Sequence, residues 1–325
     1  MASLRAILTC LFIAAGLIAK PGFATPLAKC IGLSNQDIAL IVNADDVGMH
    51  PDLDKAAFKL IDAGQIQDLS LMPPTPNFAQ AAQWAKARQL AVGVHLTLTN
   101  EWQEKQPWGA VLSRDEVPSL YNPQGNLWAT VAELAAHAKP DEVKKELLAQ
   151  IAKVQAAGLK ITHLDAHMVF WPATPELLKI YTSLPKETGI PVVIQSFHGS
   201  LAEQYQVHRQ IQSENAIATP DTFLMQYNPS MRQRGVAYRG YLELIKQLPR
   251  GVHTIGIHPA EDSPSAQAAI PDLTLRLSDY AAWQEPALHK AIKARGIKSI
   301  TYAPLQQLQE KLNLEPQRHC LSSPK

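Results

Sequence analysis

Two adjacent carboxylates, Asp45 and Asp46, follow an apolar run that starts at Ile38, and they precede Gly48. The β-branched residues of the run predict a buried strand, and the glycine suits a sharp turn before the helical pattern that starts near Pro51. Two neighbouring carboxylates in a poorly hydrated site cannot both stay ionised at low energy unless a cation or a proton shares the site. The pair therefore indicates a site that holds a metal ion or a proton, and a plain Asp-Asp-x-Gly turn that caps the next helix is the alternative.

Histidines stand at three other places where an apolar segment ends. They are His95, the group His163, Asp165 and His167, and His258 directly before a proline. One aspartate and two histidines make a three-ligand metal site that leaves positions open for water and substrate. Each histidine by itself could instead be a buried residue that satisfies a hydrogen bond. Chemically suited groups at four strand ends, however, favour one metal centre over four separate structural roles.

Short apolar segments alternate with helical periodicity along the chain, which predicts the α/β class with a mostly parallel sheet. The first expected strand starts at residue 38, and the others cover 69–72, 90–99, 161–167, 190–196, 252–259 and 297–301. The expected helices cover 51–63, 78–88, 140–159, 241–248, 279–295 and 304–312, and one more starts at Thr174. Residues 197–238 show no clear pattern.

About seven strand–helix units in roughly 290 residues fit a single closed or nearly closed (β/α) barrel, and a doubly wound open sheet is the alternative. In a parallel barrel the carboxyl ends of the strands converge on one face, which would bring the carboxylates and histidines together. No G-x-G-x-x-G motif follows the first strand, so a dinucleotide site is not expected.

A long irregular segment covers about residues 100–128 and carries Trp102, Trp108, Tyr121 and Trp128. A loop of this length inside a compact domain is usually functional or mobile. Exposed aromatic side chains there would suit the apolar faces of sugar rings. Alternatively, the loop packs its own aromatic side chains over the barrel rim.

The N-terminus has the pattern of a signal peptide. Arg5 precedes an apolar core, Ala6–Ala19, and the small residues of Gly22-Phe23-Ala24 predict cleavage after Ala24. We therefore expect a periplasmic or secreted protein with one catalytic domain, residues 25–325, and no membrane attachment after cleavage; an uncleaved anchor is the alternative. The formal net charge of +1 gives no reason to expect nucleic acid or an anionic membrane as a partner.

Two cysteines, Cys30 and Cys320, remain near the two ends of the chain after such cleavage. In an oxidising compartment they could form a disulfide bond, since domain termini often lie close together. Two unpaired thiols in frayed tails are the alternative.

Four motifs in order make the chain similar to the YdjC-like family of carbohydrate deacetylases, which includes chitooligosaccharide deacetylase. The motifs are Asn43-Ala-Asp-Asp-Val-Gly48, Gly93-Val-His-Leu-Thr-Leu-Thr99, Thr162-His-Leu-Asp-Ala-His167 and His258-Pro259. The resemblance implies a distorted (β/α) barrel of the polysaccharide-deacetylase type with one divalent metal ion, Zn²⁺ or Mg²⁺. It also implies hydrolysis of an N-acetyl group from an amino sugar or oligosaccharide.

The resemblance assigns roles by position. Asp46, His95 and His167 would be the metal ligands, Asp45 the general base and His258 the general acid. Arg276 and Asp279 are further expected to orient Asp45, unless this Arg-x-x-Asp pair forms an ordinary surface contact.

The chain departs from the family pattern after His167. Chitooligosaccharide enzymes continue this motif with further histidines, whereas this chain continues with Met-Val-Phe-Trp171, and Val47 stands where Phe is common. The expected ligands are kept and the expected pocket wall differs, so the substrate stays open. A metal hydrolase of another amide or ester is one alternative. A non-catalytic periplasmic carbohydrate-binding protein is another, although a pure binding protein needs no base such as Asp45.

Overall fold

The computed structural model describes residues 26–196, 200–315 and 320–321. The predicted signal segment, residues 1–24, lies outside the described residues, so cleavage after Ala24 stays a prediction. Within the described ranges, no helix combines the length and the apolar character needed to cross a membrane.

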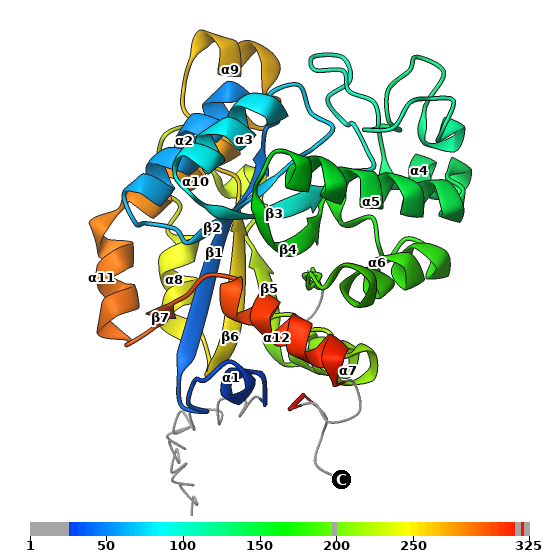
Figure 1. Cartoon of the computed structure of the whole chain (residues 1–325). Coiled ribbons are helices and arrows are strands. Elements are labelled where there is room, and N and C mark those ends of the chain that lie inside the picture. Colours follow the sequence, from blue (N-terminus) through cyan, green and yellow to red (C-terminus); the bar gives the residue numbers. More distant parts are fainter. Residues whose placement is uncertain (1–25, 197–199, 316–319, 322–325) are drawn as a thin grey trace, which may run out of the picture.

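Seven strands form one sheet, in the order β4-β3-β2-β1-β6-β5, with β7 paired to β1 (Figure 1). The pairs are parallel throughout. The strands are β1 Ile38–Val47, β2 Asp68–Leu71, β3 Ala91–Leu96, β4 Lys160–Ala166, β5 Thr222–Met225, β6 Gly251–Ile257 and β7 Lys298–Ser299. This arrangement confirms the predicted single-domain α/β fold with a parallel sheet.

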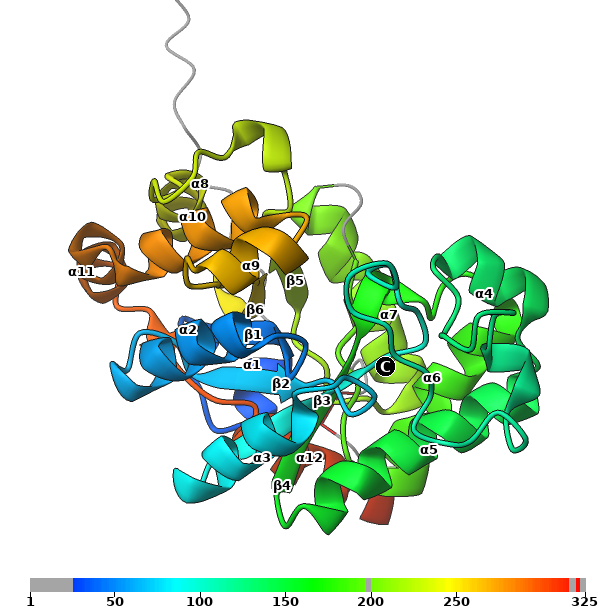
Figure 2. The ribbon, with the colours of Figure 1, turned by 90° about the horizontal axis from the view of Figure 1, so that it is seen from above.

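The sheet curves into a nearly closed barrel. Beyond β4, Val192 forms a parallel bridge with Leu164, and the backbone N–H of Ile194 donates to Thr219 Oγ1 at 3.0 Å, just before β5. The edges β4 and β5 are thus joined through the segment 190–196 and not by a continuous ladder. Figure 2 shows the strands grouped at the centre with helices around them.

Helices pack around the strands because the sheet is apolar on both faces, as parallel sheets usually are; every residue of β6 is buried. The helices that precede β4 are α1 Pro26–Cys30, α2 Pro51–Asp62, α3 Phe78–Ala87, α4 Val131–His137 and α5 Pro140–Ala156. Those that follow are α6 Pro175–Thr188, α7 Leu201–Asn215, α8 Gly240–Gln247, α9 Pro264–Ala269, α10 Leu273–Gln284, α11 Pro286–Ala294 and α12 Ala303–Leu314. Short 3-10 turns are η1 Pro118–Leu120, η2 His167–Val169 and η3 Pro229–Met231.

The predicted helix 279–295 is wrong in its bounds. Two helices, α10 and α11, cover this region, and Glu285 between them is extended, with φ −67° and ψ 120°. The break follows from Pro286, because a residue before proline is disfavoured in the helical region.

The predicted strand 190–196 is reduced to the single bridge at Val192.

The long segment between β3 and α4 is an ordered loop. Asn100, fully buried, ties it together: its amide donates to the carbonyls of Gln106 and Trp108, and its Oδ1 accepts from the N–H of Trp102. Trp102 and Trp108 are only 5% and 4% exposed. For these two residues the expectation of exposed aromatic side chains is wrong, and the loop packs its own aromatic rings.

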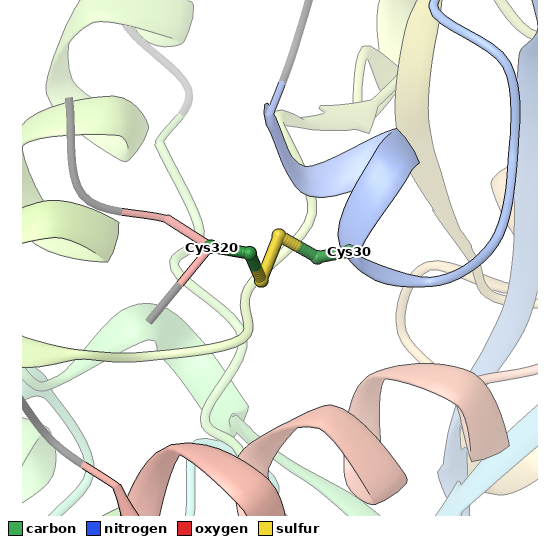
Figure 3. Close-up of a disulfide and its surroundings, with 2 residues drawn as sticks. All are labelled: Cys30 and Cys320. Carbon is green, nitrogen blue, oxygen red and sulfur yellow. A yellow bond between two sulfur atoms is a disulfide. The ribbon is translucent and has the colours of Figure 1, made fainter. Parts of the chain in front are cut away.

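The first and last residues that the structure describes lie together, at the end of the barrel opposite this loop (Figure 1). Cys30 of α1 and Cys320 form a disulfide bond, with their Cα atoms 5.8 Å apart (Figure 3). The sequence leaves a disulfide bond and two unpaired thiols as alternatives, and the structure has the disulfide bond.

Candidate metal centre

Asp45 and Asp46 lie where β1 leaves regular strand geometry. On a regular strand, adjacent side chains point to opposite faces of the sheet. Here the register between β1 and β2 shifts between Ala44 and Val47, and Asp46 has a φ of 64°, in the left-handed region that few side chains adopt. This irregularity lets both carboxylates reach one buried cluster, where they are 3% and 2% exposed.

Asp46, His95 and His167 come together at the carboxyl ends of β1, β3 and β4. Asp46 Oδ1 lies 3.3 Å from His95 Nε2 and 3.2 Å from His167 Nδ1. The three candidate ligand atoms all lie within 4.8 Å of one another, and all three residues are buried. The structure therefore brings together the three residues that the sequence singles out as ligands.

The second nitrogen of each imidazole is held by a further carboxylate. His95 Nδ1 lies 3.0 Å from Asp165 Oδ1, and His167 Nε2 lies 2.9 Å from Glu101 Oε2. When these nitrogens carry the proton, the other nitrogen of each ring turns its lone pair toward Asp46. The arrangement is the usual one for histidines that bind a metal.

Three electron-rich atoms that face one another need a positive charge between them. Asp46 Oδ1 is buried and accepts no hydrogen bond of normal geometry. Ligand atoms about 2.1 Å from an ion, at angles of about 90–109°, lie roughly 3.0–3.4 Å apart, which matches the two separations above. The residues therefore fit a divalent metal ion, and two imidazoles favour a transition metal over Mg²⁺.

The pKa values of the two histidines reflect the same demand for positive charge. Burial lowers the pKa of His167, but Glu101 and Asp46 outweigh burial and raise it to about 9. Burial also opposes a charge on His95, yet Asp165 and Asp46 hold its pKa well above the usual value. Without a metal both rings would be protonated at neutral pH, and a bound cation would replace those protons.

Asp45 lies beside these three residues but makes different contacts. Its Oδ1 accepts from Asn43 Nδ2 at 2.7 Å, and its Oδ2 lies 3.9 Å from His258 Nε2. Burial, followed by the charge of Asp165, raises the pKa of Asp45 to about 8. A cation beside it would lower this pKa again, which leaves a carboxylate able to take a proton from water.

His258 follows β6 directly and is fixed through its backbone. Its N–H donates to Asp279 Oδ2 at 3.1 Å, and Asp279 forms a buried ion pair of 2.7 Å with Arg232. The ring of Tyr227 lies edge-on, with its centroid 5.6 Å from that of His258. Burial lowers the pKa of His258 to about 4, so the ring is neutral at neutral pH.

The expectation that Arg276 and Asp279 orient Asp45 is wrong. Arg276 pairs with the neighbouring carboxylate, Asp46, and Asp279 holds the backbone of His258. Both residues are nevertheless buried at this site and do not form the surface contact that was the alternative.

His163 does not join the cluster, because it lies deeper in the barrel and stacks on Tyr302, with centroids 3.7 Å apart. The sequence groups Asp165 with His163 and His167 by their alternate spacing but assigns it no separate role. It does not identify Glu101. Glu101 lies in an irregular loop, and no periodicity points to it.

A cavity of about 590 Å³ lies between the loop and α4, and Glu101, Trp102, Trp128 and Glu133 are among the residues that line it. Glu101, whose carboxylate contacts His167, connects the cavity to the centre. The volume of the cavity is in the usual range for sites that bind small molecules.

Comparison with known proteins gives a consistent family. A family model described as "YdjC-like protein" matches residues 39–294. A carbohydrate deacetylase of Enterococcus faecalis (strain ATCC 700802 / V583) is 26% identical over 272 residues, which cover 82% of this chain and 97% of that protein. Another, from Brevibacillus brevis, is 36% identical over 154 residues, which cover 47% of this chain and 58% of that protein.

A solved structure is also similar over most of the chain. It is described as a cellobiose-phosphate cleavage protein from Enterococcus faecalis V583. It has a TM-score of 0.72 and 26% sequence identity, and the match covers 83% of this chain and 99% of that one.

Proposed function

This chain belongs to the YdjC-like protein family, and we propose that it is a metal-dependent hydrolase that removes an N-acetyl group from an amino sugar or oligosaccharide outside the cytoplasm. Curated relatives named carbohydrate deacetylase support a hydrolase that acts on amides. The observation that carries the metal dependence is the meeting of Asp46, His95 and His167 around a buried carboxylate oxygen without a hydrogen bond.

In this proposal Asp46, His95 and His167 would hold one divalent ion. The ion would polarise the amide carbonyl and lower the pKa of the attacking water. The two imidazoles suit Zn²⁺ better than Mg²⁺.

Asp45 acts as the general base and takes a proton from the water as its oxygen attacks the carbonyl carbon. The carbon–nitrogen bond of the tetrahedral intermediate then breaks, and the leaving nitrogen takes a proton from His258, because an amide anion is too poor a leaving group. His258 is neutral at rest, so it must first receive that proton. Asp45 Oδ2 lies 3.9 Å from His258 Nε2, and in this proposal it passes on the proton it took from water once the two side chains approach to hydrogen-bond distance.

The disulfide bond between Cys30 and Cys320 supports a location in the periplasm or outside the cell. Disulfide bonds persist in oxidising compartments and are rare in the cytosol. The predicted signal peptide points to the same location.

Met168, which follows His167, differs from the family pattern, so the identity of the substrate is not fixed by the resemblance. Met168 is 50% exposed and has a φ of 54°, an unfavourable backbone conformation that turns its apolar side chain outward. Chitooligosaccharide enzymes have further histidines at this place, and this chain has an apolar residue. A second candidate function is therefore hydrolysis of another amide or an ester.

The test is acetate release from N-acetylglucosamine oligomers and from aryl acetates, with and without a chelator. We expect release from the sugars to stop with chelator and to return with Zn²⁺. Metal-dependent release from aryl acetates alone would support the second candidate. Saccharide binding without turnover of any compound would support a binding protein and refute the enzyme.

A further inference from the structure

His167 uses both ring nitrogens, and its partners come from different parts of the fold. Nδ1 lies 3.2 Å from Asp46 Oδ1 in the barrel. Nε2 lies 2.9 and 3.1 Å from the two carboxylate oxygens of Glu101 in the loop that follows β3. One loop residue therefore decides which nitrogen of His167 faces the centre.

The loop does not need this carboxylate for its own structure. Within the described part of the chain, the only hydrogen bonds of the Glu101 carboxylate are those to His167. The adjacent residue, Asn100, is fully buried and supplies the bonds that hold the loop. The bonds of Asn100 thus fix the backbone next to Glu101, and the Glu101 carboxylate contributes to the metal centre and not to the loop.

Asp165, which holds the other histidine, differs from Glu101 in its surroundings. Its second oxygen accepts from Ser70 Oγ at 2.8 Å and from Asn43 Nδ2 at 3.2 Å, and its side chain is only 4% exposed. The Glu101 side chain is 24% exposed and lines the cavity of about 590 Å³. His95 is therefore fixed from within the barrel, and His167 from the cavity side.

We propose that Glu101 is a positioning residue for the metal centre: its carboxylate accepts the Nε2–H of His167, so that Nδ1 keeps its lone pair directed at the ion beside Asp46. The inference rests on the proposed metal-dependent function and adds to it that the loop completes the centre. Carboxylates that hold ligand histidines in this way commonly change metal affinity about 10–100-fold when they are removed.

The experiment measures zinc affinity of the full-length mature protein by competition with a chromophoric chelator, for wild type, E101A, E101Q and E104A. Glu104 is a matched control, because it is an exposed glutamate that lines the same cavity from the same loop without a contact to His167. The thermal unfolding midpoint of each metal-free variant is measured in parallel.

We expect E101A to weaken zinc binding about 10–100-fold and E101Q to fall between E101A and wild type, because the amide oxygen can still accept from Nε2–H. E104A should bind zinc and unfold as wild type does. Metal-free E101A and E101Q should unfold at lower midpoints, because both lose the pairing of the Glu101 carboxylate with protonated His167, so zinc affinity is compared at a temperature at which all four proteins are folded. Equal zinc affinity of E101A and wild type would overturn the inference and leave the proposed function standing, as would equal weakening by E101A and E104A. No zinc binding by wild type would overturn both.

Discussion

Arg276 Nη1 lies 2.8 Å from Asp46 Oδ2, on the side of the carboxylate opposite the two histidines. Burial would raise the pKa of Asp46, but Arg276 and the histidines hold it well below the usual value. The guanidinium also pairs with Asp272, from its Nε to Asp272 Oδ1 at 2.8 Å. Asp46 is therefore ionised before any metal binds, and only its Oδ1 is directed at the candidate ligand cluster.

Arg276→Met should lower the free energy of unfolding of the metal-free protein by about 3–5 kcal/mol. Removing one member of a buried ion pair leaves the other charges uncompensated, and here two carboxylates, Asp46 and Asp272, would lose their partner. Urea unfolding in the presence of chelator measures the change. Arg234→Met is the control, because the Arg234–Asp262 pair is exposed and should contribute about 0–1 kcal/mol. Equal destabilisation by the two substitutions would contradict the claim that the buried ion pairs of Arg276 stabilise the fold more than an exposed pair does.

Asp45→Asn should lower kcat by about 10²–10⁴-fold in a protein that still binds zinc. Asparagine cannot take a proton from water, and the candidate ligands Asp46, His95 and His167 are unchanged in this variant. In the metal-free protein Asp45 has a pKa of about 8 and is protonated at neutral pH, so a neutral amide should fit its site. Acetate-release kinetics and a zinc titration of the same preparation separate the two effects. Unchanged kcat would remove the role of Asp45 as the base.

The sequence predicts that the carboxylates and histidines at four strand ends converge, because parallel strands place these ends on one face. The choice of Asp46, His95 and His167 among them comes from the family resemblance. The sequence does not predict how Asp45 and Asp46 share one side of the sheet. That depends on the register shift between Ala44 and Val47, which no periodicity records. It also does not predict Glu101, whose position depends on how the loop folds back.

The failure to identify α7 and β5 from the sequence has a different cause. The buried face of α7 is polar, with Gln204, His208 and Gln212. Gln212 Nε2 donates to Thr219 O at 2.8 Å, and His208 Nδ1 lies 2.9 Å from Pro220 O. A helix that packs by hydrogen bonds to a neighbouring backbone shows no apolar periodicity, so patterns of hydrophobicity cannot find it.

Cys30→Ser with Cys320→Ser should lower the free energy of unfolding by about 2–5 kcal/mol. The bond joins residues separated by 290 positions, and a cross-link across a long loop restricts the unfolded chain most strongly. Mass spectrometry of the non-reduced protein checks the bond itself, and urea unfolding checks its contribution. Two free thiols in protein exported to an oxidising compartment would contradict the structure at this point.

His253→Gln should make the stability of the metal-free protein less sensitive to acid. Both ring nitrogens of His253 are engaged: Nδ1 lies 2.8 Å from Thr222 Oγ1 and Nε2 lies 2.9 Å from Pro249 O. Burial lowers the pKa of His253 from 6.5 to about 4, so the unfolded chain binds a proton at a pH where the folded protein does not. The free energy of unfolding therefore falls as the pH drops from about 6.5 toward 4, by on the order of 3 kcal/mol for this group.

The measurement is urea unfolding in chelator at several pH values between 4 and 7. The comparison concerns the pH dependence of each variant, so a constant loss of stability in His253→Gln does not affect it. His137 is exposed, and His137→Gln should keep the wild-type pH dependence. If His253→Gln and wild type lose stability in parallel as the pH falls, His253 is not a neutral buried group in the folded protein.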